Sequence, residues 1–237
     1  MPRNVHKRRR ARPNRRKYPR KRLKGRRRGP VTLRVMRKII PDRTLIKMRY
    51  VSDIVLNPAA GSTASYVYSC NGMYDPDITS TGHQPMGFDQ WMAFYQHYTV
   101  LGSKLSCSFA SSNADLTTGA AIVGVAQRAT STAVSTNSST LRERPNTRWR
   151  YLRPLYSGQR TTVTSRFSAR KFFGKPKGGV LTEIDLKGNA SSNPAEEAYW
   201  HIFAAGVQDT YDAGVISVNI TLSFVAMLTE AKEFSAS

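Results

Sequence analysis

The sequence predicts an all-β domain preceded by a basic, disordered N-terminal arm. Three observations predict it. The positive charge, a net +22 over 237 residues, is concentrated in the first fifth of the chain. The remainder contains seven segments in which apolar and polar residues alternate or apolar residues run together, as in β-strands. Long polar loops separate these segments, without the alternation of strands and helices that indicates a parallel sheet.

The arm, residues 1–42, is too highly charged to fold by itself. Residues 7–28 contain 15 Lys or Arg and no acid, with few apolar side chains to offset the entropy of ordering them. Residues 1–49 hold 22 bases and one acid, a net +21, whereas the other 188 residues hold 15 bases and 14 acids, a net +1. A basic arm on a near-neutral body is typical of a segment that binds nucleic acid.

Such an arm gains affinity by neutralising phosphates, with little readout of bases. We expect nucleic acid to be bound by Arg8, Arg9, Arg10, Arg12, Arg15, Arg16, Lys17, Arg20, Lys21, Arg22, Lys24, Arg26, Arg27, Arg28, Arg34, Arg37 and Lys38. The runs "KRRR" and "RKRLKGRRR" are also typical of a nuclear localisation signal. The arm is therefore predicted to bind nucleic acid and also to bind nuclear import receptors.

Two strands are expected at the start of the folded domain, which spans residues 43–237. In 44–56 the apolar Ile46 and Met48 alternate with polar residues, which predicts one buried face. Residues 63–70 have the mixture of β-branched and aromatic residues that is common in strands.

Residues 87–100 break this period of two. Large apolar residues recur there at steps of three and four: Phe88, Trp91, Met92, Tyr95 and Tyr98. This spacing predicts a short helix of about two turns that leads into a strand. We expect these aromatic residues to lie in the core rather than to form a platform for stacking bases.

The second half of the domain is expected to supply the remaining strands. Five more strands are expected at 103–110, 119–127, 160–168, 198–207 and 214–228, which makes seven with the two above. An eighth strand is expected somewhere in 171–186. In 119–127, Gly124 allows close packing or a bulge. The polar segments 129–140, 173–180 and 187–197 are expected to be loops. Eight strands and one inserted helix, without a βαβ rhythm, favour a single eight-stranded antiparallel jelly roll.

No pattern in the chain predicts catalysis, a metal site or a cofactor. Asp75 and Asp77 flank a proline and are interpreted as turn residues. Cys70 and Cys107 lie in alternating runs and are expected to be free, buried thiols. The four histidines are scattered without metal-ligand spacing. No apolar run approaches the roughly 18 residues of a membrane span, so no membrane insertion is expected.

Three parts of the domain carry a resemblance. In "YDPD…GHQPMGFDQWMAFYQHYTVLGSKL" (74–105), a G-H-Q-P turn precedes a short aromatic helix and a strand containing G-S-K. The segment "RTTVTSRFSARKFFGKPKGG" (160–179) contains an aromatic-x-x-K-P loop, and "AYWHIFAAGV" with "VISVNITLSFVAML" supplies two closing strands. Together these segments resemble the capsid proteins of circular Rep-encoding single-stranded DNA viruses, the circovirus-like family, over essentially the whole chain.

This resemblance implies a viral capsid (coat) protein. In that family 60 copies form a T=1 icosahedral shell, with the arms inside on a circular single-stranded DNA genome and loops outside and at contacts between copies. The implied partners are further copies of the chain, the viral single-stranded DNA, host nuclear import receptors and a host attachment receptor that the sequence does not identify. The implied locations are the virion and, during assembly, the host nucleus.

Two alternatives stay open. The capsid protein of a small single-stranded RNA virus can have the same arm and fold, and the residues barely separate it from the DNA alternative. A ribosomal or chromatin protein that binds polyanions without forming a shell is also conceivable. Proteins of that kind usually spread their bases over the folded domain, whereas this domain is nearly neutral.

Overall fold

A computed structural model describes residues 40–79, 81–111, 120–132, 134, 138–153, 160–208 and 210–233. The chain divides into two units, Met1–Lys38 and Ile39–Ser237, and only the second contains described residues. The expected disorder of the arm therefore concerns residues that lie almost entirely outside the described ones.

The described part of the second unit is built mainly of β-strands, with four short helices in the connections between them. In chain order the elements are β1 (Arg43–Leu56), β2 (Thr63–Ser69), α1 (Phe88–Phe94), β3 (Tyr95–Ser111), β4 (Ala121–Arg128), α2 (Ser138–Glu143), β5 (Thr147–Leu152), β6 (Thr161–Ser168), α3 (Ala169–Phe172), α4 (Gly179–Thr182), β7 (Lys187–Gly188), β8 (Tyr199–Gly206) and β9 (Ile216–Ala231).

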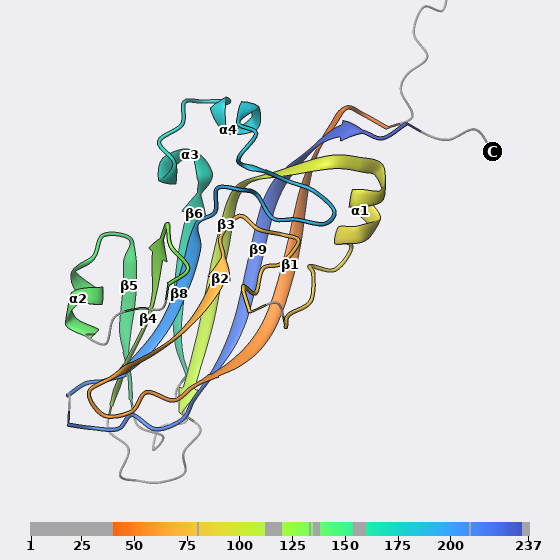
Figure 1. Ribbon diagram of the computed structural model, residues 1–237. Helices are drawn as coiled ribbons and strands as arrows, with labels where there is room; N and C mark the ends of the chain where they lie inside the picture. Colours follow the sequence, from red (N-terminus) through yellow and green to blue (C-terminus); the bar gives the residue numbers. More distant parts are fainter. Residues whose placement is uncertain are drawn as a thin grey trace, which may run out of the picture. The chain divides into compact units, whose positions relative to one another are not determined.

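The strands form two antiparallel sheets with the topology of a jelly roll (Figure 1). One sheet has the order β1-β9-β3-β6, with the two-residue β7 beside β3, and the other has the order β2-β8-β4-β5. The connections β1–β2, β3–β4, β5–β6 and β8–β9 each carry the chain from one sheet to the other. Two sheets of four main strands each, joined in this way, confirm the predicted jelly roll.

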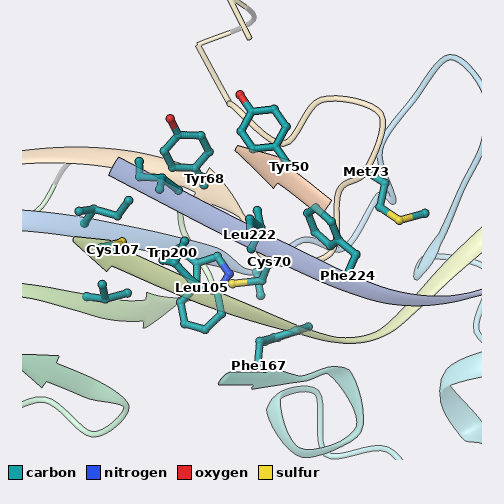
Figure 2. Packing of buried hydrophobic residues seen from close by; sticks show 14 of the residues in the cluster. Tyr50, Tyr68, Cys70, Met73, Leu105, Cys107, Phe167, Trp200, Leu222 and Phe224 are labelled. Carbon is teal, nitrogen blue, oxygen red and sulfur yellow. The ribbon is translucent and has the colours of Figure 1, made fainter. Parts of the chain in front are cut away.

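The core lies between the sheets, because each long strand turns one apolar face toward the other sheet. β9 pairs along its length with β1 on one side and with β3 on the other. Its inward-facing Leu222 and Phe224 are completely buried, whereas its alternate residues point outward. Figure 2 shows these side chains with Leu105 of β3 and Trp200 of β8, which are also completely buried.

Most of the predicted strands are found close to their expected bounds. β1, β2, β4, β6, β8 and β9 each begin and end within three residues of the prediction. The strand expected at 103–110 is longer, because β3 starts directly after α1 at Tyr95 and continues to Ser111.

The prediction of an eighth strand in 171–186 is wrong. That segment contains α4 and the end of α3, whereas the eighth strand is β5, with the sequence "TRWRYL". Among the described strands β5 pairs with β4 alone, which makes it an edge strand. Arg148 and Arg150 pair with Val125 and Val123, whose side chains lie in the core between the sheets. At an open edge the long Arg side chains reach water, so the strand lacks an apolar alternation.

Two short elements occupy segments that were expected to be loops. α2 begins at Ser138 and buries Leu141 in a small cluster with Phe203 and Ile122. β7 pairs its Lys187 and Gly188 with β3. In both places a few contacts order a segment whose composition is mostly polar.

The prediction for the aromatic helix is only partly confirmed. Phe88, Met92 and Tyr95 are buried, but Trp91 is 39% exposed and Phe94 is 44% exposed. A seven-residue helix contacts the core along one line, with positions spaced i, i+4 and i+7. Trp91 and Phe94 lie on the other side of that line, so the expectation that Trp91 belongs to the core is wrong.

The small residues of the core behave as predicted. Cys70 and Cys107 are free and buried, and burial raises the pKa of both thiols, which makes them poor nucleophiles. A Cβ atom on Gly124 would lie 2.5 Å from the Phe203 ring and 2.8 Å from the Arg148 carbonyl oxygen. Gly124 therefore serves close packing between strands, one of its two predicted roles.

Candidate nucleic-acid interface

The 17 bases predicted to bind nucleic acid all precede residue 40 and lie outside the described residues. Their arrangement in space is therefore not described. The folded domain nevertheless carries a basic surface of its own, which the charge count along the sequence did not predict.

A row of basic residues crosses the outward face of the β1-β9-β3-β6 sheet. Arg49 of β1 pairs with Ser223 of β9, and Ser223 pairs with Lys104 of β3, which in turn pairs with Arg166 of β6. The three bases are exposed. Residues paired in this way stand side by side on one face of a sheet. Because strands lie about 4.8 Å apart, the row spans about 14 Å.

This row lines a groove of about 760 Å³. Lys47, two residues before Arg49 on the same face of β1, also lines it. Ser223 lies between Arg49 and Lys104 in the row, and Ser106 and Thr221 also line the groove. Their hydroxyl groups can donate or accept hydrogen bonds. The lining therefore combines positive charge with neutral donors.

Two further hollows adjoin this groove at the edge formed by β6 and β5. Arg166, Phe167 and Ser168 line both the first hollow and a second one, which also includes Arg148 and Lys171. Arg148 in turn lines a third hollow with Arg150. We call the three hollows together the basic groove. Its seven bases are Lys47, Arg49, Lys104, Arg148, Arg150, Arg166 and Lys171.

No carboxylate of the described residues balances these charges. Among the described residues, none of the three linings includes Asp or Glu, and none of the seven bases forms a salt bridge. The acids of this sheet lie toward its two ends. Asp53 accepts a hydrogen bond of 2.6 Å from Asn219, and Glu230 accepts one of 3.1 Å from Lys187.

The charge count missed this surface because its boundary was drawn at residue 49. Lys47 and Arg49 were counted with the arm, but both lie on β1. Many acids of the domain lie in loops, so a near-neutral total conceals a basic face. The alternation within 44–56 is the signal that could have found it, because it places Lys47 and Arg49 opposite the buried Ile46 and Met48.

A second exposed surface is apolar and belongs to α1 and the turn before it. Met86 is 93% exposed, and Trp91 and Phe94 are partly exposed. Large apolar side chains grouped on one short segment are typical of a surface that contacts another protein. We call these three residues the α1 apolar surface.

The acids and histidines of the described residues do not gather into a metal site. No group of three or more His, Cys, Asp or Glu that could hold a metal occurs among them. The Asp77 carboxylate accepts hydrogen bonds from the Thr79 backbone N–H (3.1 Å) and hydroxyl (2.8 Å), as a turn residue does. None of the helices in the described part of the chain has the length and apolar content for crossing a membrane.

His201 is a buried histidine whose environment disfavours its charged form. It is completely buried on β8, and its Nε2 lies 2.7 Å from the Thr130 carbonyl oxygen. Burial, and then the positive charges of Arg128 and Arg144, lower the pKa of His201 to about 4, although the hydrogen bond to Thr130 opposes this shift. The folded protein therefore holds His201 neutral at pH values where an unfolded chain would protonate it.

We expect this histidine to make the domain less stable in mild acid. The folded pKa lies below the ordinary value of 6.5, so stability is fully present above pH 6.5 and falls as the pH drops toward 4. At pH 4 the loss attributable to His201 is about 3 kcal/mol. Urea unfolding at several pH values measures it.

The matched variant for this measurement is His201→Gln, whose amide can still donate to the Thr130 carbonyl. Its unfolding free energy should fall less than that of the parent chain between pH 6.5 and 4, since all other titrating groups are shared. Parallel pH profiles for the two proteins would show that His201 is not responsible.

Comparisons with known proteins return distant structural similarity only. No protein family and no curated protein matches the sequence. A structure of Turnip yellow mosaic virus has a TM-score of 0.42 and 13% identity, covering 82% of this chain and 98% of that one. The 60-mer BFDV capsid protein has a TM-score of 0.44 and 12% identity (82% and 97% covered), and Cocksfoot mottle virus has 0.45 and 13% (80% and 97%). Likenesses this distant carry no argument about function.

Proposed function

We propose that this chain is a viral capsid protein whose copies assemble into a closed shell around a nucleic-acid genome. The observation that carries the proposal is the segregation of charge along the chain. Residues 1–42 hold 19 Lys or Arg and one acid, and they precede a complete jelly roll. An arm with this density of charge requires a polyanion as its partner.

The same segregation suits a domain that must contact its own copies. A surface that is basic all round would repel identical neighbours at every contact. In this chain the arm carries a net +18, whereas residues 43–237 hold 18 bases and 14 acids, a net +4, so most of the net charge lies off the domain that must make these contacts. The α1 apolar surface offers one such contact, since its Met86, Trp91 and Phe94 are exposed in the single chain.

In its specific form, the proposal is a T=1 shell of 60 copies that packages circular single-stranded DNA through the 17 arm bases. The motifs at 74–105 and 160–179 favour this form, because they resemble those of circovirus-like capsids. With a net +18 on each arm, 60 arms would supply about 1,100 charges, enough for about 1,100 phosphates. The runs "KRRR" and "RKRLKGRRR" would serve nuclear import, with assembly in the host nucleus.

Electron microscopy of the purified full-length chain tests this function. We expect uniform shells on the order of 200 Å across, from the packing of 60 domains of this size. Sequencing the nucleic acid from isolated virus particles should return circular single-stranded DNA. Dispersed protein that binds DNA without forming shells would contradict the capsid function. Shells that contain single-stranded RNA would support the capsid function but would show that the proposed DNA genome is wrong.

A further inference from the structure

We infer that the basic groove is a second nucleic-acid site, one that binds the phosphates of a single strand on the folded domain itself. The inference rests on the proposed function, in that the chain meets a genome. It differs from that function in its location. The seven bases of the groove lie on β1, β3, β5, β6 and α3, β9 also contributes to the lining, and none of the 17 arm bases is included.

The dimensions of the groove suit a sugar–phosphate backbone. The row from Arg49 to Arg166 spans about 14 Å, and a stacked strand places one phosphate about every 3.4 Å of its axis. About four phosphates therefore fit along the row. Arg49 and Arg166 can each donate two parallel hydrogen bonds to one phosphate, and Lys104 adds a point charge between them.

The bases of the groove need an anion to offset their mutual repulsion. Lys104 and Arg166 stand directly opposite each other on neighbouring strands, and like charges in such a pair destabilise a sheet. Arg148 and Arg166 line the same hollow. Because no described carboxylate lies in the lining, a bound phosphate chain is the partner that would compensate all of these charges together.

The groove is suited to the backbone and not to the bases of the nucleic acid. Stacking requires exposed aromatic faces. In the lining, Phe167 is only 4% exposed, and the half-buried Phe172 packs its ring against those of Phe167 and Phe173. Trp149 is half-buried, and the Arg142 guanidinium lies 5.2 Å from its ring centre. Binding in the groove should therefore be independent of sequence and strongly dependent on salt.

The test compares two sets of substitutions in a full-length chain whose 17 arm bases are replaced by Gln, the arm-neutral chain. The groove set is Lys47→Gln, Arg49→Gln, Lys104→Gln and Arg166→Gln. The control set removes the same charge from exposed bases outside the groove: Arg144→Gln, Arg153→Gln, Arg160→Gln and Lys177→Gln. Fluorescence anisotropy measures binding to a 20-nucleotide oligo(dT) over a range of salt concentrations.

We expect the arm-neutral chain to bind oligo(dT) weakly, with a slope of log K against log salt of about −3 to −5, from four to seven phosphates at 0.7 each. The groove set should weaken binding at low salt by about tenfold or more and reduce the slope by about 3. The control set should change the affinity by less than about twofold, because its bases do not share one groove. Thermal unfolding verifies that both sets fold.

Equal effects of the two sets, or no binding by the arm-neutral chain, would overturn the inference. So would a groove set that keeps its affinity for DNA but loses association between copies, since the groove would then bind the acidic loops of a neighbouring copy. The proposed role of the arm fails separately, if the arm-neutral chain binds as tightly as the parent. In that case the comparison of the groove and control sets still decides whether the basic groove binds single-stranded DNA.

Discussion

Replacing the 17 arm bases by glutamine should abolish packaging and leave the domain folded. None of these bases lies in a strand or helix of the jelly roll, so the free energy of unfolding should be unchanged. If all 17 contact phosphates, their loss removes a slope of about −12 from the salt dependence of binding, at about 0.7 per phosphate. Shells of the arm-neutral chain should show the ultraviolet absorbance ratio of protein nearly free of nucleic acid.

The control for this experiment is the set Arg144, Arg153, Arg160 and Lys177 replaced by glutamine in the parent chain. Shells of this control should carry a normal load of nucleic acid. A full load in arm-neutral shells would reject the proposed role of the arm. A parent chain whose affinity for single-stranded DNA is unchanged between low and physiological salt would reject it as well, because phosphate neutralisation requires that dependence.

Replacing Trp200 by alanine should destabilise the domain by about 3–5 kcal/mol. Trp200 is the largest of the completely buried side chains and lies between the two sheets (Figure 2). Its indole N–H makes no hydrogen bond among the described residues, so the cost comes from lost packing and from the cavity that remains. The loss is comparable with the whole stability of many domains. Urea unfolding followed by circular dichroism measures it.

Trp91 provides a matched control, since it is the same residue type in an exposed position on α1. Trp91→Ala should cost less than about 1 kcal/mol of stability, and its effect should instead fall on the association of copies measured by sedimentation. If Trp91→Ala unfolds the subunit as readily as Trp200→Ala, the α1 apolar surface belongs to the core after all. A stable Trp200→Ala variant would contradict the packing described for the two sheets.

The sequence predicted the strands wherever one face of a strand is buried and the other is wet. β9 alternates so regularly that its burial could be assigned residue by residue. β5 was missed because its inner positions are Arg148 and Arg150, which reach solvent at the edge of the sheet and leave no apolar alternation. Trp91 was wrongly predicted to be buried. The periodicity of apolar residues shows which positions share one side of a helix, but not how wide a strip of that side contacts the core.

The basic arm could be predicted because charge density is a property of the chain, independent of its fold. The basic groove could not, because Arg49, Lys104 and Arg166 are 55 and 62 residues apart in sequence and meet only through strand register. Counting charge by segment sums over both faces of a sheet, and it therefore cancels the bases of one face against acids located elsewhere.

The position of β9 in the chain has a consequence for synthesis on the ribosome. β9 lies between β1 and β3, yet about 170 residues separate the start of β1 from the start of β9. Among the described strands β1 pairs with β9 alone, so it stays unpaired until β9 has left the ribosomal exit tunnel. Contacts of such long range form slowly. The basic arm emerges before any of this folding, so a nascent chain exposes the 17 bases that we propose to bind phosphates while the domain is still incomplete.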